Sequence, residues 1–222
     1  MGSVVAVDQN HPQHNVLGEA TRVLREGGVL VMPTDSVYGI GCAATPRNPA
    51  HERIFSIKHR DRAQTLPWLV ADPSDVLVYG RDVPAWMERL AYELWPGALT
   101  LVVQASDAVP QEYRAANGTI ALRVPDSNLV RSLAKEVGPL ATTSANIHGE
   151  EAATSGASVD KSIIEAADLT LDAGPAPLAI ASTIVGCENG APKVYREGAI
   201  PAQQCLAMSE QGGYSPSLGA AR

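Results

Sequence analysis

Short apolar runs alternate along the chain with segments in which apolar residues recur at helical spacing. The apolar runs predict strands at residues 29–33, 66–71, 99–103, 119–124, 139–143, 169–171, 182–187 and 193–195. Periodicity and cap residues predict helices at 14–26, from 49 to a basic cluster at 58–62, and at 84–94, 128–137 and 158–167. This alternation predicts an α/β fold with helices covering a sheet. The late strands follow one another closely, so the sheet is expected to be mixed.

No shift in composition divides the chain before about residue 205. Its 222 residues suffice for one large α/β domain, and residues 1–207 are predicted to form that single domain. Residues 208–222 are rich in Gly, Ser and Pro, and we expect them to be a disordered tail.

The composition narrows the range of functions. The net charge is −7, the pI is about 5.2 and aromatic residues make up 5% of the chain. Proteins whose main function is to bind nucleic acid are usually basic, and those that bind single-stranded nucleic acid present aromatic side chains. The chain therefore fits a small anionic ligand in a local basic site better than it fits a nucleic-acid platform.

Cysteine usage and the absence of export signals favour a cytoplasmic protein. Cys42, Cys187 and Cys205 are widely spaced and odd in number, which fits buried, reduced thiols rather than disulfides or a metal knuckle. The N-terminus lacks a basic segment and a long apolar run, so no secretory signal is expected. No segment approaches the ~20 apolar residues of a membrane span, so no membrane association is expected.

Positive charge is nevertheless concentrated in one place. Lys58, His59, Arg60 and Arg62 follow one another at the end of a predicted helix, directly before the strand predicted at 66–71. Such a cluster can be a solvated helix end or an anion site, and the residues alone leave both open.

Familiar nucleotide and metal motifs are absent or weak. The stretch GIGCAA at 39–44 matches a loose G-x-G-x-x-A, but TPRNP follows where a dinucleotide-binding fold needs a helix. There is no P-loop and no G-x-S-x-G elbow. His11 and His14 have no partner cluster, so no resident metal site is predicted.

Polar residues at strand ends supply the remaining candidates. Ser36 follows the buried strand at 29–33, in a segment that could equally be a self-satisfied turn. Alternation along 119–124 places Ile120, Leu122 and Val124 on the core face and Thr119, Ala121 and Arg123 on the other. Arg123, with small neighbours on its face, has room to hold an anion, although a surface salt bridge is the alternative.

The later strands end in polar residues as well. Thr142 and Ser144 share one side of the LATTSAN stretch, where a capped turn is the alternative. Ser182 begins a strand and Arg196 follows one. A mixed sheet could bring these hydroxyls together with Lys58 and Arg60 on one concave face, where they would suit a polyanion such as a nucleoside triphosphate.

These residues lie in motifs that resemble one known family, the YrdC-like threonylcarbamoyl-adenylate synthases. The resemblance runs from about Val16 to Ile200, and the motifs fit in both order and spacing. They are GGVLVMPTDSVYGIGCAA, the K-x-R of KHR, WPGALTLV, TIALRVP, TTSAN, LDAG, STIV and YREG. The resemblance implies a twisted open mixed sheet with flanking helices and a large basic concave face, in the short, single-domain form.

The resemblance also implies a reaction and its participants. L-threonine, bicarbonate and ATP, the last with Mg²⁺, would give threonylcarbamoyl-AMP and pyrophosphate. A partner transferase complex would then use the product to modify an adenosine beside the anticodon of certain tRNAs, and the protein itself could make a weak contact with tRNA.

Roles carry over to matching positions. By resemblance, L-threonine would contact Ser36, Arg123, Thr142 and Ser182, with Arg123 on its carboxylate. The nucleotide would contact Lys58, Arg60, Thr119, Ser144 and Arg196; of these, Lys58 would lie beside the reacting phosphate, and Lys58, Arg60 and Ser144 would be catalytic.

The sequence departs from the family pattern at several positions, and two other functions stay open. Ser36 stands where Thr is frequent, Asp61 and Thr65 replace two prolines, and Leu69 aligns with a histidine of some members. One alternative is a non-enzymatic RNA-binding module, which the acidic charge disfavours. The other is a paralogue that uses a different carbamate, which the joint presence of K-x-R and S-A-N disfavours.

Overall fold

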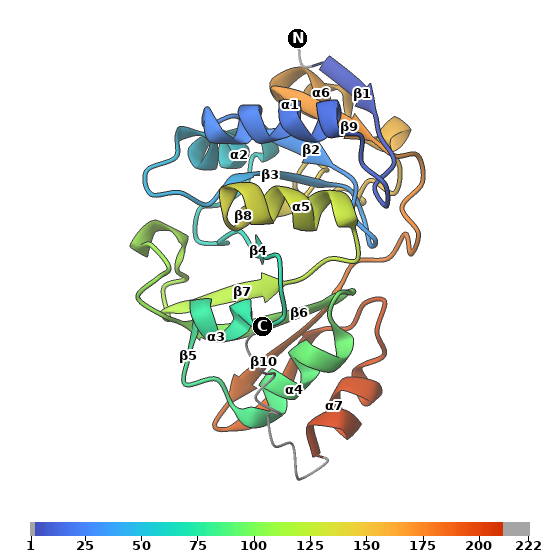
Figure 1. Cartoon of the computed structure of the whole chain (residues 1–222). Coiled ribbons are helices and arrows are strands. Elements are labelled where there is room, and N and C mark those ends of the chain that lie inside the picture. The colour runs from blue at the N-terminus through green and yellow to red at the C-terminus, as the bar shows by residue number, and fades with distance from the viewer. Residues whose placement is uncertain (1–2, 211–222) are drawn as a thin grey trace.

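A single twisted mixed sheet organises the molecule in the computed structural model, which describes residues 3–210 (Figure 1). The strand order is β1-β9-β2-β3-β8-β4-β7-β6-β10-β11, with β5 paired to β6. The strands are β1 Ser3–Ala6, β2 Leu30–Met32, β3 Gly39–Ala43, β4 Trp68–Leu69, β5 Gly80–Arg81, β6 Leu99–Ala105, β7 Thr119–Arg123, β8 Leu140–Ser144, β9 Leu169–Asp172, β10 Thr183–Glu188 and β11 Ala191–Arg196. The predicted mixed sheet is confirmed, since β10 runs parallel to β6 and antiparallel to β11.

Different helices cover the two faces of the sheet. They are α1 His14–Arg25, α2 Pro49–Lys58, α3 Asp75–Tyr79, α4 Ala85–Leu94, α5 Asn128–Val137, α6 Lys161–Ala166 and α7 Ala202–Glu210, with 3-10 turns at Gln111–Tyr113 and Gly156–Ser158. On one face, α1 and α5 lie side by side and bury an apolar cluster with β2 and β8. The apolar side chains of the other face, in a cluster that includes Ile40, Leu101 and Leu122, pack with residues of α2, α4, α6 and α7.

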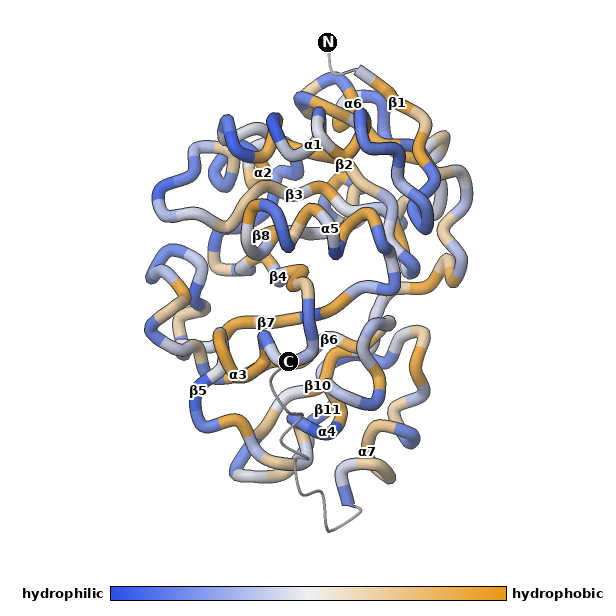
Figure 2. The backbone as a smooth tube through the Cα atoms, viewed as in Figure 1, coloured by the Kyte–Doolittle hydropathy of each residue, from blue (hydrophilic) through white to orange (hydrophobic). Residues whose placement is uncertain are grey.

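The face that carries α1 and α5 bears a cavity farther along the sheet. Leu30 and Met32 of β2 pack beneath these helices. By strand register and alternation the same face continues through Thr142, Arg123 and Thr100, which line the cavity. In Figure 2, hydrophilic and hydrophobic residues alternate along α1 and α5, as expected of helices with one buried side.

Most predicted elements are confirmed, and the differences have local causes. Asn48 caps α2 by accepting a hydrogen bond from the Ala50 amide, and α5 spans the predicted residues 128–137. The strand predicted at 66–71 is only Trp68–Leu69. Before it, Pro67 has no N–H for a ladder, and after it the Ala71 amide donates to Asp75 Oδ2 instead of to a strand. The helix predicted from residue 158 begins at Lys161, after Asp160 caps it.

Five elements were not predicted: β1, β3, α3, β5 and α7. The predicted boundary at residue 207 falls inside α7, where Cys205 is buried and Met208 packs against the core. Residues 211–222 of the predicted tail lie outside the described residues. Within residues 3–210, no helix combines the length and apolarity needed to cross a membrane.

Candidate active site

A cavity of about 450 Å³ lies on the sheet face beyond α1 and α5, and we call it the site cavity. Strands β6, β7, β8 and β10 contribute to its walls, together with the segment between β2 and β3. Seven of the nine predicted site residues line it: Ser36, Arg60, Arg123, Thr142, Ser144, Ser182 and Arg196. The structure therefore brings these seven residues, three of them arginines, together around one cavity.

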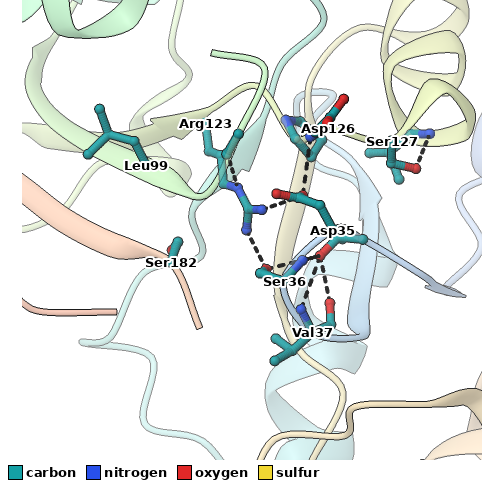
Figure 3. Close-up of polar contacts among 12 residues, drawn as sticks. Asp35, Ser36, Val37, Leu99, Arg123, Asp126, Ser127 and Ser182 are labelled. Atoms are coloured by element: carbon teal, nitrogen blue, oxygen red, sulfur yellow. Dashed lines mark hydrogen bonds and ion pairs between the residues drawn. The ribbon is translucent and has the colours of Figure 1, made fainter. Parts of the chain in front are cut away.

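Arg123 lies at the centre of a buried polar network (Figure 3). Its Nε donates to the Gly97 carbonyl oxygen at 2.9 Å, Nη1 donates to Ser36 Oγ at 2.7 Å, and Nη2 donates to Asp35 Oδ1 at 2.5 Å. A guanidinium has five N–H groups, so these three bonds leave two for a ligand. Because Arg123 is only 6% exposed, the alternative of a surface salt bridge is excluded.

Asp35 compensates the buried charge of Arg123. Burial lowers the pKa of the Arg123 guanidinium, and the adjacent Asp35 carboxylate opposes that shift. The Asp126 amide also donates to Asp35 Oδ1, at 3.2 Å. Asp35 Oδ2 is buried and has no hydrogen-bond partner among the described residues. The ion pair thus fixes the guanidinium against the sheet while leaving one carboxylate oxygen unsatisfied.

The segment before β3 is both a turn and part of the site. Thr34 Oγ1 donates to the Val37 carbonyl at 2.7 Å and accepts from the Ser36 and Val37 amides at 3.2 and 3.3 Å. This is the self-satisfied turn that the sequence allowed. Ser36 Oγ remains directed at Arg123, so the turn orients the candidate hydroxyl.

Glycines of β3 make room for Thr142. A Cβ at Gly39 would lie 2.7 Å from Thr142 Cγ2, and a Cβ at Gly41 would lie 2.5 Å from Thr142 Oγ1. Real Cβ atoms essentially never approach so closely. The G-I-G pattern that resembled part of a dinucleotide motif therefore serves strand packing beside the site.

Ser182 is held by two neighbours inside the cavity. Its hydroxyl is 2.8 Å from Thr100 Oγ1, and Arg196 Nη2 donates to the Ser182 carbonyl oxygen at 2.8 Å and to Oγ at 3.3 Å. Sequence reasoning missed Thr100, although a lone threonine within the apolar run at 99–103 was the available signal. Its position on the same face as Arg123 places its hydroxyl in the site.

Arg60 and Ser144 line the cavity beside Asn146 and Glu150, two further residues that sequence reasoning did not single out. Arg60 Nε donates to the Gln64 carbonyl at 3.0 Å, and burial lowers the pKa of its guanidinium. Among the described residues, Arg60 and Arg196 form no ion pair with a carboxylate, and their charge is available to an anion.

Lys58 does not line the cavity. Its side chain is buried with 1% exposure, and Nζ donates to the carbonyl oxygens of Ser144, at 2.5 Å, and of Asn146, and contacts Asn146 Oδ1 at 3.4 Å. These contacts occupy the three N–H groups of an ammonium. Lys58 is therefore neither a solvated helix end nor a lining residue, and its hydrogen bonds hold the Ser144–Asn146 turn.

Thr119 also lies outside the site cavity. Its hydroxyl donates to Asn117 Oδ1 at 2.8 Å, and the residue lines a neighbouring cavity of about 310 Å³. The two cavities share Val102. Thr119 begins β7 and Arg123 ends it, so the same face of one strand carries both.

The departures from the family pattern lie in and beside the cavity. Leu69 and Thr65 line it, and Asp61 Oδ1 accepts from the Ala63 amide at 2.9 Å, which stabilises the turn without a proline.

Within residues 3–210, no group of three or more His, Cys, Asp or Glu side chains lies together as a metal site.

Comparisons with known proteins identify the relatives of this chain. The Sua5/YciO/YrdC family model, described as telomere recombination, matches residues 22–198. A putative threonylcarbamoyl-AMP synthase of Mycobacterium leprae is 36% identical, with 83% of each chain covered. The threonylcarbamoyl-AMP synthase of Pyrococcus abyssi is 31% identical over 83% of this chain and 54% of its own length.

Solved structures show the same fold. Pyrococcus abyssi Sua5 complexed with L-threonine has a TM-score of 0.86 and 28% identity, covering 93% of this chain and 60% of that one. Escherichia coli YciO has a TM-score of 0.81 and 26% identity, covering 93% of this chain and all of that one. The chain thus spans the full length of some relatives and just over half of others.

Proposed function

Because this chain belongs to the Sua5/YciO/YrdC family, we propose that it is a threonylcarbamoyl-AMP synthase, a nucleotidyltransferase of the cytoplasm. Its substrates would be L-threonine, bicarbonate and ATP, and its products threonylcarbamoyl-AMP and pyrophosphate. A transferase complex would consume the first product to modify tRNA. The names of the relatives support the activity, and the threonine complex of one relative supports the amino acid.

One observation carries the proposal: the cavity offers cationic side chains for two separate anionic groups. Arg123 has two N–H groups left beside the Ser36 hydroxyl, which suits a carboxylate. Arg60 and Arg196 also line the cavity and form no ion pair among the described residues, which suits a polyphosphate. An amino acid and a nucleotide bound there would share one cavity.

The proposed chemistry needs no covalent contribution from the protein. The threonine amine and bicarbonate give a carbamate and water. A carbamate oxygen then attacks the α-phosphorus. The bond between the α-phosphorus and the oxygen that bridges to the β-phosphate breaks, and pyrophosphate leaves with that oxygen. Catalysis of this kind depends on positioning two anionic groups and stabilising the charge that develops at phosphorus.

The side chains of the cavity suit these tasks. Arg123, Ser36, Thr142 and Ser182 would hold threonine, and Arg60, Ser144 and Arg196 would hold the phosphates. Lys58 would act through the Ser144–Asn146 turn that it supports. Mg²⁺ would arrive with ATP, ligated mainly by phosphates and water, because the described residues offer no cluster of acidic ligands.

The test is direct. The purified protein is incubated with ATP, Mg²⁺, bicarbonate and each amino acid in turn, and products are examined by mass spectrometry while pyrophosphate release is followed. We expect threonylcarbamoyl-AMP, with pyrophosphate release that requires both threonine and bicarbonate. Equal release without threonine would instead identify an ATPase or a different substrate.

A further inference from the structure

Two segments of the chain meet beside the site cavity. Residues 181–183 lead into β10, and residues 196–200 continue from the end of β11. The Ala199 amide donates to the Ala181 carbonyl oxygen at 2.9 Å, which joins the two segments directly. Arg196 belongs to the second segment and lines the cavity. The contacts between the segments therefore bear on where this cation lies.

The hydroxyl of Thr183 makes three more hydrogen bonds between them. Thr183 Oγ1 donates to the Ile200 carbonyl oxygen at 2.5 Å and accepts from the amides of Gly198 and Ile200 at 2.9 and 3.2 Å. A hydroxyl has one donor and two acceptor lone pairs, so this side chain uses its whole hydrogen-bonding capacity on one stretch of main chain. Thr183 is fully buried, and loss of its hydroxyl would leave main-chain groups unpaired, which is costly.

The carbonyl group of Ser182 lies between the two segments. A Cβ at Gly198 would be 2.6 Å from the Ser182 carbonyl oxygen and 2.1 Å from that of Ala181, so only a residue without a side chain fits this approach. Arg196 Nε and Nη2 donate to the same Ser182 oxygen at 3.1 and 2.8 Å. The guanidinium and the main chain that follows it are therefore held against one carbonyl group.

Thr183 itself does not reach a ligand in the site cavity. Side chains alternate along a strand, and the neighbours Ser182 and Ile184 line the cavity whereas Thr183 does not. Thr183 pairs instead with Leu99, which packs in the apolar cluster of the other face. Any effect of Thr183 on a ligand must therefore pass through residues 198–200 and Arg196.

We propose that Thr183 is a positioning residue that fixes the Arg196 guanidinium at the site cavity. The ladder between β10 and β11 is irregular beside Arg196, because Ile184 pairs with Arg196 while Val185 pairs with Val194. The Thr183 hydroxyl supplies the missing constraint on the other side of Arg196, where the strand has ended.

This constraint affects binding because a cation that is already in place binds an anion more tightly than one that must first be ordered. The inference rests on the proposed contact between Arg196 and the phosphates of ATP. It adds to that contact a residue that touches neither substrate.

Titration calorimetry with ATP, inorganic triphosphate and L-threonine tests the assignment. Thr183→Val keeps the shape and removes the hydroxyl, and Thr183→Ser retains the hydroxyl. We expect Thr183→Val to lose roughly two- to tenfold in affinity for ATP and for triphosphate, and Thr183→Ser to bind like the wild type. Threonine affinity should stay unchanged in both variants, because Thr100 holds the Ser182 hydroxyl from β6.

Thr170→Val is the matched control. Thr170 is a fully buried threonine of β9 whose hydroxyl has no hydrogen-bond partner among the described residues. Its replacement makes the same chemical change in the core without touching residues 198–200, so affinity for all three ligands should match the wild type. A loss of ATP affinity equal to that of Thr183→Val would show that any such core change weakens the site, and would overturn the inference.

A double variant separates positioning from a general loss of stability. If Thr183 acts through Arg196, Thr183→Val should cause no further loss of ATP affinity when Arg196→Met is already present. The same loss in both backgrounds, or an equal loss of threonine affinity, would overturn the inference. So would ATP binding that Arg196→Met leaves unchanged, although the proposed function would then stand. A wild-type protein that bound neither ATP nor triphosphate would overturn the proposed function itself.

Hydrogen exchange in the wild type gives a test that needs no variant to fold. Coupling between sites is reciprocal, so saturating triphosphate should slow exchange of the Gly198 and Ile200 amides by the same roughly two- to tenfold factor. The reference is the Val109 amide, which donates to the Ser106 carbonyl oxygen in a turn outside the cavity lining. Exchange at Gly198 and Ile200 that triphosphate left unchanged relative to Val109 would overturn the inference.

Discussion

The ammonium nitrogen of Lys58 lies 2.5 Å from the carbonyl oxygen of Ser144, a residue of the cavity lining to which Lys58 itself does not belong. Lys58 also donates to the carbonyl of Asn146, so one buried charge fixes two residues whose side chains reach the site. This arrangement differs from direct contact with a phosphate. We therefore propose that Lys58 acts in the synthase reaction as a positioning residue.

Replacing Lys58 should therefore affect turnover more than ATP affinity. Lys58→Met keeps most of the volume and removes the hydrogen bonds to both carbonyls. Each hydrogen bond to a charged group contributes about 1.5–3 kcal/mol, so we expect kcat to fall at least roughly tenfold. Steady-state rates, read beside ATP dissociation constants from calorimetry, measure the two effects separately.

Arg62→Met is the matched control for this change. Arg62 belongs to the same basic cluster, but its side chain is 70% exposed and pairs with Glu52. Its replacement should leave both constants near the wild-type values. If Lys58→Met lost ATP affinity by the same factor as kcat, Lys58 would contact the nucleotide itself.

Lys58 should also titrate at an unusual pH. Burial, with a smaller contribution from Arg60, lowers the pKa of Lys58 to about 8. Nuclear magnetic resonance of lysine labelled at Cε should show this midpoint, whereas Lys193, whose pKa is raised by its hydrogen bond to Glu188, should titrate at higher pH. A Lys58 midpoint near 10.5 would mean that the carbonyl oxygens outweigh burial.

The same shift predicts a dependence of stability on pH. Lys58 has a pKa near 10.5 when unfolded and about 8 when folded. Between these values the unfolded chain binds more protons, so this residue makes the free energy of unfolding rise with pH. Denaturant unfolding at about pH 7.5 and about pH 10 should show that rise in the wild type relative to Lys58→Met. Equal slopes in the two proteins would contradict the assignment.

Much of the fold and most of the site followed from local sequence signals. Ser127 and Gly138 bound α5 at the predicted residues because cap chemistry is local. By contrast, β3 was missed because Gly39 and Gly41 carry no strand preference and are required by the approach of Thr142 from β8. Such an approach depends on tertiary structure.

The site residues also differ in whether local sequence or tertiary contacts determine the direction of the side chain. Strand alternation identified Arg123 because its direction follows from neighbouring residues in the chain. The direction of Lys58 could not be inferred, since its partners are the main-chain oxygens of a turn 86 and 88 residues away. Residue type alone cannot tell a lysine that holds a turn from one that holds a phosphate.

Arg123 should be required both for threonine binding and for stability. Arg123→Ala removes the proposed carboxylate contacts, and we expect threonine affinity to fall roughly ten- to a hundredfold with ATP affinity nearly unchanged. It also leaves Asp35 buried without its partner, which should lower the free energy of unfolding by about 3–5 kcal/mol.

A double variant separates the two effects. Adding Asp35→Asn to Arg123→Ala removes the uncompensated charge, so part of the lost stability should return while threonine binding stays weak. Calorimetry and denaturant unfolding on the same samples measure both. Recovery of threonine binding in the double variant would show that Arg123 acts only by neutralising Asp35.

The contact between Thr100 and Ser182 gives a subtler test of the threonine half of the site. The two hydroxyl oxygens lie 2.8 Å apart and both residues line the cavity. Thr100→Val keeps the shape and removes this hydrogen bond, worth about 0.5–1.5 kcal/mol, so threonine affinity should fall roughly two- to tenfold. Thr100→Ser retains the hydroxyl and should bind threonine nearly as well as the wild type, and ATP affinity should be the same in all three proteins. Calorimetry with each ligand decides the matter: if the valine and serine variants lost threonine affinity equally, the methyl group of Thr100 rather than its hydroxyl would be what the site requires.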